Sequence, residues 1–155
     1  MEIKYSLTKT PKEKPKDESK LGFGHIFTDH MLIMPYTAGQ GWHDPEIRPY
    51  GPIELSPASM CLHYGQTVFE GLKAYRTAEG KVQLFRPEEN FKRLNRSNER
   101  LVIPELPVDL AMQCLMALLE VEKDWVPHQE GASLYIRPFI IAADPYLGVR
   151  PADQY

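Results

Sequence analysis

The stretch LKAYRTAEGKVQLFRPEENFKRL, residues 72–94, decides the fold class of this chain. Residues 72–76 and 81–85 each alternate apolar and polar side chains, and a four-residue connection ending in glycine joins them, which predicts a β-hairpin. Pro87 and the two glutamates after it are typical of a helix start, and apolar residues then recur at helical spacing. A hairpin that leads directly into a helix indicates a mixed α+β domain.

Two further elements are expected downstream. Residues 108–125 carry apolar side chains on successive turns over a broad face, which predicts a well-buried second helix. Residues 132–143, ASLYIRPFIIAA, are nearly all apolar and include one charged residue, Arg137. We therefore interpret them as the strongest strand of the chain.

Less regular structure is expected before the hairpin. Residues 23–36 contain a short apolar run ended by a proline, which favours strands over a helix. Residues 37–52 are rich in glycine and proline, so a loop is expected there, followed by a short strand at 53–55. The pair Ser56-Pro57 is typical of the first turn of a helix, with serine in the N-cap position.

Composition limits the class of protein. Of the 155 residues, 43% are hydrophobic, which supplies one buried core and excludes a wholly disordered chain. The balance of 18 basic against 21 acidic residues argues against a general nucleic-acid binder. Residues 9–20 are nearly all charged or polar. We therefore expect residues 1–20 to be a mobile charged arm and residues 21–155 to form one small α+β domain.

The sequence also argues against a membrane-spanning or secreted protein and against a metal site. No apolar stretch is long enough to cross a bilayer or to act as a secretory signal, so a cytoplasmic protein without a membrane partner is expected. The five histidines lack ligand spacing, so no metal site is expected. Cys61 and Cys114 lie far apart among apolar neighbours, and we interpret them as buried thiols.

Arg137 and Tyr135 are the first candidate site residues. They lie two positions apart in the strongest candidate strand, so their side chains are expected on the same face. A guanidinium among apolar neighbours needs a partner. One interpretation is a structural ion pair with an acidic residue of the domain. The other is a planar clamp for a ligand carboxylate, with the tyrosine hydroxyl as a second donor.

Arg93, Arg96 and Arg100 form a second candidate. Their spacing of i, i+3 and i+7 places them in one positive stripe on the helix that begins at Pro87. Such a stripe is usually the solvated face of a helix. The alternative is an anion site, with one arginine turned towards a phosphate.

Four blocks of the sequence closely resemble the N-terminal small domain of branched-chain amino acid aminotransferases, which are fold-type IV enzymes dependent on pyridoxal phosphate. The blocks are FGHIFTDHML (23–32), SPASMCLHYGQTVFEGLKAYR (56–76), LFRPEENFKRLNRS (84–97) and ASLYIRPFIIAADPYLGV (132–149). The resemblance implies a small α+β domain with a mixed or antiparallel sheet and flanking helices.

The resemblance also implies site residues. Arg93 would hold the cofactor phosphate, while Tyr135 and Arg137 would meet the side-chain carboxylate of glutamate or 2-oxoglutarate. Some of the pocket would be contributed across the interface of a homodimer. The substrate-binding residues that it implies are Phe23, Tyr64, Phe69, Tyr135, Arg137, Leu147 and Val149.

The implied reaction is transfer of the amino group of leucine, isoleucine or valine to 2-oxoglutarate. The family's Schiff-base lysine and the glutamate beside the pyridine nitrogen belong to a second domain that nothing in this sequence matches, and Lys73 does not stand at the lysine's position. We therefore expect a fragment that has no catalytic residue of its own and is inactive alone.

Two alternatives remain open at this point. One is another fold-type IV enzyme, such as a D-amino acid aminotransferase or an aminodeoxychorismate lyase. The other is a non-catalytic binding or dimerisation module.

Overall fold

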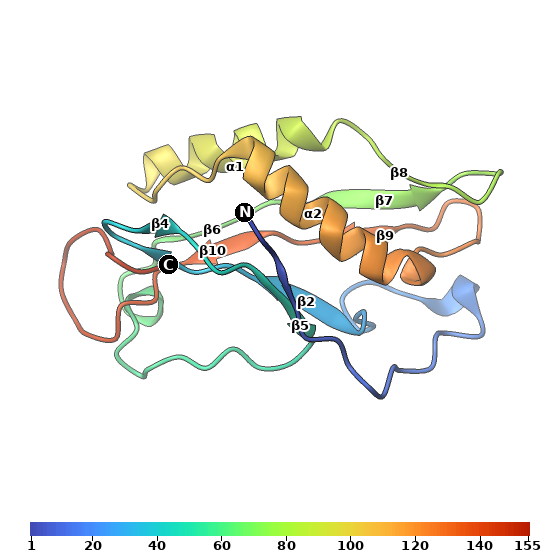
Figure 1. Cartoon of the computed structure of the whole chain (residues 1–155), viewed down its shortest axis with the longest axis horizontal. Coiled ribbons are helices and arrows are strands. Elements are labelled where there is room, and N and C mark those ends of the chain that lie inside the picture. The colour runs from blue at the N-terminus through green and yellow to red at the C-terminus, as the bar shows by residue number, and fades with distance from the viewer.

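Two helices lie together on one side of the central strands in the computed structural model, which describes residues 1–155 (Figure 1). The helices are α1 (Pro87–Arg100) and α2 (Val108–Glu122), and single turns of 3-10 helix occur at Glu18–Lys20, Met60–Leu62 and Lys123–Trp125. The strands are β1 (Lys4–Tyr5), β2 (His30–Ile33), β3 (Tyr36–Thr37), β4 (Gly41–Trp42), β5 (Glu46–Pro49), β6 (Thr67–Phe69), β7 (Leu72–Arg76), β8 (Val82–Leu84), β9 (Leu134–Ile136) and β10 (Phe139–Ile141). The α+β fold class is confirmed.

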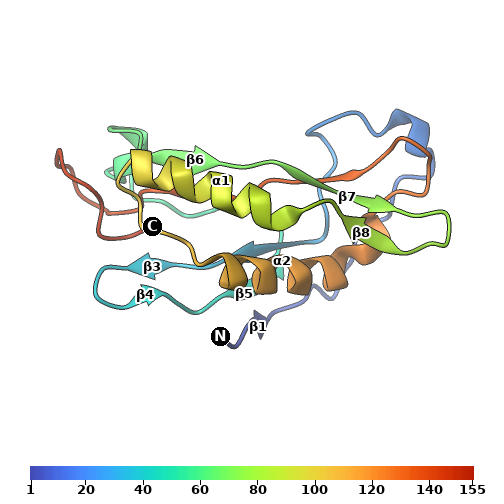
Figure 2. The ribbon, with the colours of Figure 1, turned by 90° about the horizontal axis from the view of Figure 1, so that it is seen from above.

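The strands form four small sheets. Strands β8, β7 and β9 make an antiparallel sheet in that order, and β10 pairs antiparallel with β6. A mixed sheet has the order β1-β5-β2, and β3 pairs with β4. Seen from above, α1 lies over β6 and the start of β7, while α2 runs beside β2 and β5 (Figure 2).

The predicted hairpin over 72–85 is confirmed as β7 and β8. Ala74 lies opposite Leu84, and Arg76 lies opposite Val82. The turn is closed by the Thr77 amide, which donates to the Lys81 carbonyl at 2.8 Å. Leu72 and Ala74 are buried against the helices because alternate residues of a strand share one face.

The prediction of a single strand over 132–143 is wrong in one respect, because this segment forms two strands, β9 and β10. Arg137 and Pro138 separate β9, which pairs with β7, from β10, which pairs with β6. Proline has no N–H for a strand ladder, so pairing stops at this position. Glu70 and Gly71 form the matching break between β6 and β7, and the Glu70 amide donates to the Pro138 carbonyl at 2.8 Å.

Upstream of the hairpin, the range expected to be a loop, 37–52, instead contains β4, β5 and the end of β3. Ile47 of β5 is fully buried and lies opposite Leu32 of β2, so this apolar position overrides the local glycine and proline content. The strand expected at 53–55 is absent, because its three side chains are exposed and no neighbouring strand pairs with it. The helical turn expected at Ser56 begins later, because the 3-10 turn spans Met60–Leu62 and its N-cap residue is Ser59. Ser56 instead closes a non-helical turn, in which the Ala58 amide donates to Ser56 Oγ at 3.2 Å.

Both predicted helices are confirmed, with small differences at their ends. Helix α1 ends at Arg100, so Leu101 lies past the end and is 41% exposed. Asn98, one turn earlier, is buried instead. Helix α2 ends at Glu122 and continues into the 3-10 turn over Lys123–Trp125.

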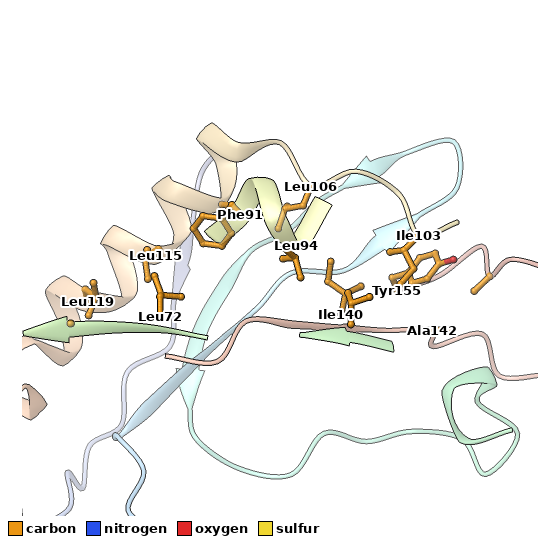
Figure 3. Packing of buried hydrophobic residues seen from close by; sticks show 14 of the residues in the cluster. Leu72, Phe91, Leu94, Ile103, Leu106, Leu115, Leu119, Ile140, Ala142 and Tyr155 are labelled. Carbon is orange, nitrogen blue, oxygen red and sulfur yellow. The ribbon is translucent and has the colours of Figure 1, made fainter. Parts of the chain in front are cut away.

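The main core lies between the helices and the strands below them (Figure 3). Phe91 and Leu94 of α1 and Leu115 of α2 point towards Leu72 of β7 and Ile140 of β10. Burial of such side chains stabilises the fold by about 1.5–3 kcal/mol each. Because the helices cover one face of the strands, the opposite face of β7 and β9 is left for a site.

Residues 1–20 contact the domain at several points. Tyr5 pairs with Ile47 in a parallel bridge, and the Lys12 amide donates to Asp29 Oδ1 at 2.8 Å. The Thr8 amide donates to His30 Nε2 at 2.9 Å. The mobility expected for this arm stays a prediction.

Two smaller expectations concern thiols and membranes. Cys61 and Cys114 are both free, and burial raises the pKa of the Cys114 thiol. Cys61 is only half-buried. No helix has the length and apolar character needed to span a bilayer.

Candidate functional site

A buried carboxylate holds an exposed arginine where the β6–β7 segment breaks. Arg93 Nε donates to Glu70 Oε1 at 2.5 Å, and Arg93 Nη2 donates to Glu70 Oε2 at 2.8 Å. The side chain of Glu70 is 6% exposed, whereas that of Arg93 is 58% exposed. Parallel contacts of this kind fix the plane of the guanidinium.

Neighbouring groups complete the environment of Glu70. Asn90 lies one turn before Arg93 on α1, and its Nδ2 donates both to Glu70 Oε2 and to the Gly71 carbonyl, each at 3.1 Å. The Gly71 amide donates to Glu70 Oε2 at 2.9 Å. Burial acts to raise the pKa of Glu70, but hydrogen bonds from Arg93, Asn90 and Gly71 outweigh it and lower this pKa below its ordinary value.

The other two arginines of the stripe are placed differently. Arg96 and Arg100 are exposed, and neither side chain makes a hydrogen bond or an ion pair within the chain. Arg96 lies instead on an open groove that it shares with Lys92 and Glu99. Only Arg93 therefore has a fixed orientation.

A second group of side chains lies at the break between β6 and β7, where Tyr135 packs against Gly71. A Cβ atom at position 71 would lie 2.2 Å from Tyr135 Oη, so no larger residue fits there without displacing the tyrosine. Tyr135 lies directly opposite Lys73 in the β7–β9 pairing. The Gly71 peptide is thus close to the tyrosine hydroxyl and is also hydrogen-bonded to the Glu70 and Asn90 side chains.

Arg137 lies in the gap between β9 and β10, not within a strand as the sequence predicted. Its Nε and Nη2 donate to Tyr135 Oη at 3.1 and 2.9 Å, and its guanidinium lies 4.3 Å from the ring centroid of Phe69. The residue is exposed and forms no ion pair with an acidic residue, so the first of its two interpretations, a structural ion pair, is wrong. The arginine is instead held by an aromatic face and a hydroxyl.

Phe23 completes this cluster. Its ring packs edge-to-face on that of Tyr135, with 5.0 Å between the centroids. Phe23 and Phe69 remain 66% and 61% exposed. The structure thus brings Phe23, Phe69, Tyr135 and Arg137 into one contact group with apolar walls and one cation.

Tyr64 and Val149 are brought together elsewhere. They line an open pocket of about 330 Å³, with Leu101, Val102 and Arg150 among the other lining residues. Val149 is 92% exposed, and Leu147, on the same loop, is 59% exposed but does not line this pocket.

Asp144 fixes the base of the loop that carries Leu147 and Val149. Its fully buried carboxylate accepts hydrogen bonds from the amides of Asp153 and Gln154 and from Arg150 Nη2. Burial acts to raise the pKa of Asp144, but these hydrogen bonds outweigh it and lower the pKa below its ordinary value.

Sequence reasoning did not assign Glu70, Asn90 or Asp144 to the site. A signal was present for Asn90, because residues at i and i+3 share a helix face and so Asn90 lies beside Arg93. For Glu70 and Asp144 no local pattern distinguishes a buried carboxylate from an exposed one. Their partners come from segments distant in sequence or across a loop.

Chemically, the arrangement suits a ligand that carries anionic groups and an apolar part. Arg93 and Arg137 each have free N–H donors at the surface, and they flank one break in the strands. Exposed aromatic side chains lie beside Arg137. Fold and candidate site together define an α+β module with two exposed arginines at one break in its strands.

Comparison with known proteins identifies the relatives of this module. The chain is 58% identical over 144 residues to branched-chain-amino-acid transaminase 1 of Bacillus subtilis (strain 168), covering 93% of this chain and 40% of that protein. It is 54% identical over 153 residues to branched-chain-amino-acid aminotransferase 2 of the same organism, covering 99% of this chain and 42% of that protein. No protein-family model matches the chain.

A solved structure agrees with these relatives. It is a branched-chain amino acid aminotransferase from T.th. complexed with N-(5'-phosphopyridoxyl)-L-glutamate, and it has a TM-score of 0.54 and 27% identity to this chain. The match covers 77% of this chain and 36% of that one. The chain is therefore homologous to branched-chain amino acid aminotransferases over nearly all of its own length, and it spans about two fifths of the curated relatives.

Proposed function

We propose that this chain, over residues 21–155, is the small domain of a homodimeric branched-chain amino acid aminotransferase that uses pyridoxal phosphate. The whole enzyme would transfer the amino group of leucine, isoleucine or valine to 2-oxoglutarate. One observation carries the proposal: a fixed, exposed Arg93 and an exposed Arg137 bonded to Tyr135 flank the same strand break, on a chain 58% identical to such a transaminase.

The residues present fit the phosphate of the cofactor. Arg93 is exposed, its orientation is fixed by Glu70, and its Nη1 has no partner within the chain. A charge-assisted contact from a guanidinium to a phosphate is among the strong hydrogen bonds of proteins. When bound, pyridoxal phosphate supplies the electron sink for exchange of an amino group between an amino acid and a 2-oxo acid.

The role of Arg137 would be to bind the acidic substrates. A pocket that accepts both leucine and glutamate cannot bury a fixed charge at its end, because leucine would leave that charge desolvated and unpaired. Arg137 is exposed and already satisfied in part by Tyr135 Oη, which suits a residue at the rim of a pocket. Phe23 and Phe69 would form the apolar wall.

The remaining predicted residues would act at the dimer interface. Leu147 and Val149 are exposed apolar residues on a loop whose base is held by Asp144. Such side chains gain free energy when a second surface covers them. In the proposed dimer they reach the partner's pocket, and Tyr64 also contributes across the interface.

The catalytic lysine would be supplied outside these 155 residues. This part of the proposal is supported by the comparison of lengths, since the matched region spans only 40% of the Bacillus subtilis transaminase. The isolated chain should therefore not transaminate, because transfer of an amino group through pyridoxal phosphate needs a covalent lysine nucleophile.

The two half-reactions of the full-length protein test the proposal. The cofactor spectrum should change when leucine alone is added, and it should be restored by 2-oxoglutarate alone. A protein that reacts with D-amino acids but not with leucine would instead be another fold-type IV enzyme. Turnover of leucine with 2-oxoglutarate by the purified 155-residue chain would overturn the assignment of the lysine to another part of the protein.

A further inference from the structure

Glu70 and Arg93 form an ion pair whose two side chains differ strongly in solvent exposure. The carboxylate is buried, with 6% of its side chain exposed, whereas the guanidinium it holds is 58% exposed. A surface arginine normally samples many rotamers, and ordering it costs side-chain entropy. Here that ordering occurs in the folded chain before any ligand arrives.

The contact uses one particular edge of the guanidinium. Glu70 accepts from Nε at 2.5 Å and from Nη2 at 2.8 Å, which together form the side edge of the arginine fork. Nη1 makes no hydrogen bond within the chain. The end edge, made of Nη1 and the second N–H of Nη2, is therefore free to donate two parallel hydrogen bonds to an anion.

Glu70 is itself held on several sides. Its Oε2 accepts from Asn90 Nδ2 at 3.1 Å and from the Gly71 amide at 2.9 Å, in addition to Arg93. Its own amide donates to the Pro138 carbonyl at 2.8 Å. Contacts from α1 and from the strand break thus fix the carboxylate, the contact with the β9–β10 connection fixes the Glu70 backbone, and the carboxylate in turn fixes the arginine.

We infer that Glu70 is a positioning residue, which acts through Arg93 to aim the free edge of the guanidinium at the phosphate of the cofactor. This inference rests on the proposed function, in which Arg93 binds that phosphate. Stability alone does not account for the arrangement, because a buried carboxylate paired with an arginine is often no more stable than apolar residues of similar size. Orientation of an exposed donor edge is what the pair adds.

The test compares two ligands on the full-length protein. Glu70→Gln removes the charge that holds Arg93 and nearly preserves the side-chain volume. Binding of pyridoxal phosphate to apoenzyme should weaken about tenfold or more, because the phosphate would then have to order the arginine itself. Binding of pyridoxal, which has the same ring but no phosphate, should not change.

The same helix offers a matched control. Glu89 pairs with Lys92 on the surface of α1 at 2.8 Å, and both side chains are about half exposed, at 48% and 54%. Glu89→Gln removes the same charge from the same helix without touching Arg93, so the affinity for both ligands should be retained. Glu70→Asp serves as the second variant if Glu70→Gln does not fold: it keeps the charge but draws the carboxylate back, and should also weaken pyridoxal phosphate selectively.

Three results would overturn the inference. Equal weakening of pyridoxal and pyridoxal phosphate would make Glu70 a structural residue only. Tighter binding of pyridoxal phosphate by Glu70→Gln would mean that the carboxylate competes with the phosphate for Arg93. A further loss when Glu70→Gln is added to Arg93→Ala would mean that Glu70 does not act through the arginine.

Arg93→Ala separates this inference from the proposed function. If Arg93→Ala leaves pyridoxal phosphate binding unchanged, the phosphate assignment in the proposed function fails. If Arg93→Ala weakens that binding while both Glu70 variants retain it, only the positioning role of Glu70 fails.

Discussion

The hydroxyl of Tyr135 lies so close to Gly71 that a Cβ atom at position 71 would be 2.2 Å from Tyr135 Oη and 2.9 Å from Cζ. The same hydroxyl accepts two hydrogen bonds from Arg137. Gly71 also donates its amide proton to Glu70. One small residue therefore allows both arginine sites to lie at a single break in the strands.

Replacement of Gly71 by alanine should displace Tyr135 and disrupt its contact with Arg137. The backbone of Gly71 is not in the left-handed region, so the effect is steric. We expect a loss of about 1–3 kcal/mol in unfolding free energy, as for other overpacked sites. In the full-length enzyme the glutamate half-reaction should slow more than the leucine half-reaction.

Gly51→Ala is the control for this substitution, because a Cβ atom there meets nothing within 4 Å and Gly51 also lacks a positive φ. The unfolding free energy of Gly51→Ala, measured by urea denaturation, should be close to that of the wild type. If Gly71→Ala were equally neutral, Tyr135 would not be confined by Gly71.

Arg137→Gln should impair the acidic substrates selectively. Removing one partner of a charge pair costs about 2–5 kcal/mol, and the exposure of Arg137 places the expected loss near 2 kcal/mol. Single-turnover rates with glutamate and 2-oxoglutarate should therefore fall, while the rate with leucine changes little. Equal losses for leucine and glutamate would make Arg137 a structural residue.

The three arginines of α1 should differ in their effect on the cofactor. Arg93→Ala should weaken pyridoxal phosphate binding about tenfold or more, because one oriented charged donor is lost. Arg96→Ala and Arg100→Ala should change it much less, since neither side chain is held in one orientation. A titration of each apoenzyme with the cofactor measures this, and equal losses would indicate a diffuse positive field.

Asp144→Asn should destabilise the chain in a pH-dependent way. The pKa of Asp144 is lowered in the folded state, so its charge stabilises the fold above its ordinary pKa of 3.8, and this contribution is lost as the pH falls through the lowered value. At pH 7 we expect a loss of about 1–3 kcal/mol in unfolding free energy.

Denaturation at two pH values checks this prediction. As the pH falls below 3.8 and through the lowered pKa of Asp144, the difference between wild type and Asp144→Asn should shrink, since the folded-state carboxyl then takes up a proton and both side chains are neutral. Asp153→Asn is the control, because Asp153 is 61% exposed and contacts Arg150 at 3.3 Å. A difference that does not change with pH would show that the charge of Asp144 is not what stabilises the loop.

Several features of this chain could be predicted from the sequence because they depend on residues close together along it. The hairpin over 72–85 follows from alternation and a short turn, and the two helices follow from apolar spacing and their start signals. The four motif blocks predicted the homology with branched-chain aminotransferases, and that prediction is confirmed.

Tertiary structure alone decided which neighbours each polar side chain meets. Local pattern predicted one continuous strand over 132–143, but Pro138 cannot donate to a ladder, and pairing with two different strands leaves Arg137 in a gap. The stripe of three arginines is uniform in sequence, yet only Arg93 meets a buried carboxylate, which lies 23 residues earlier in the chain. A burial pattern repeats locally and can be read from the sequence, whereas the partner of a buried charge is set by how distant segments pack.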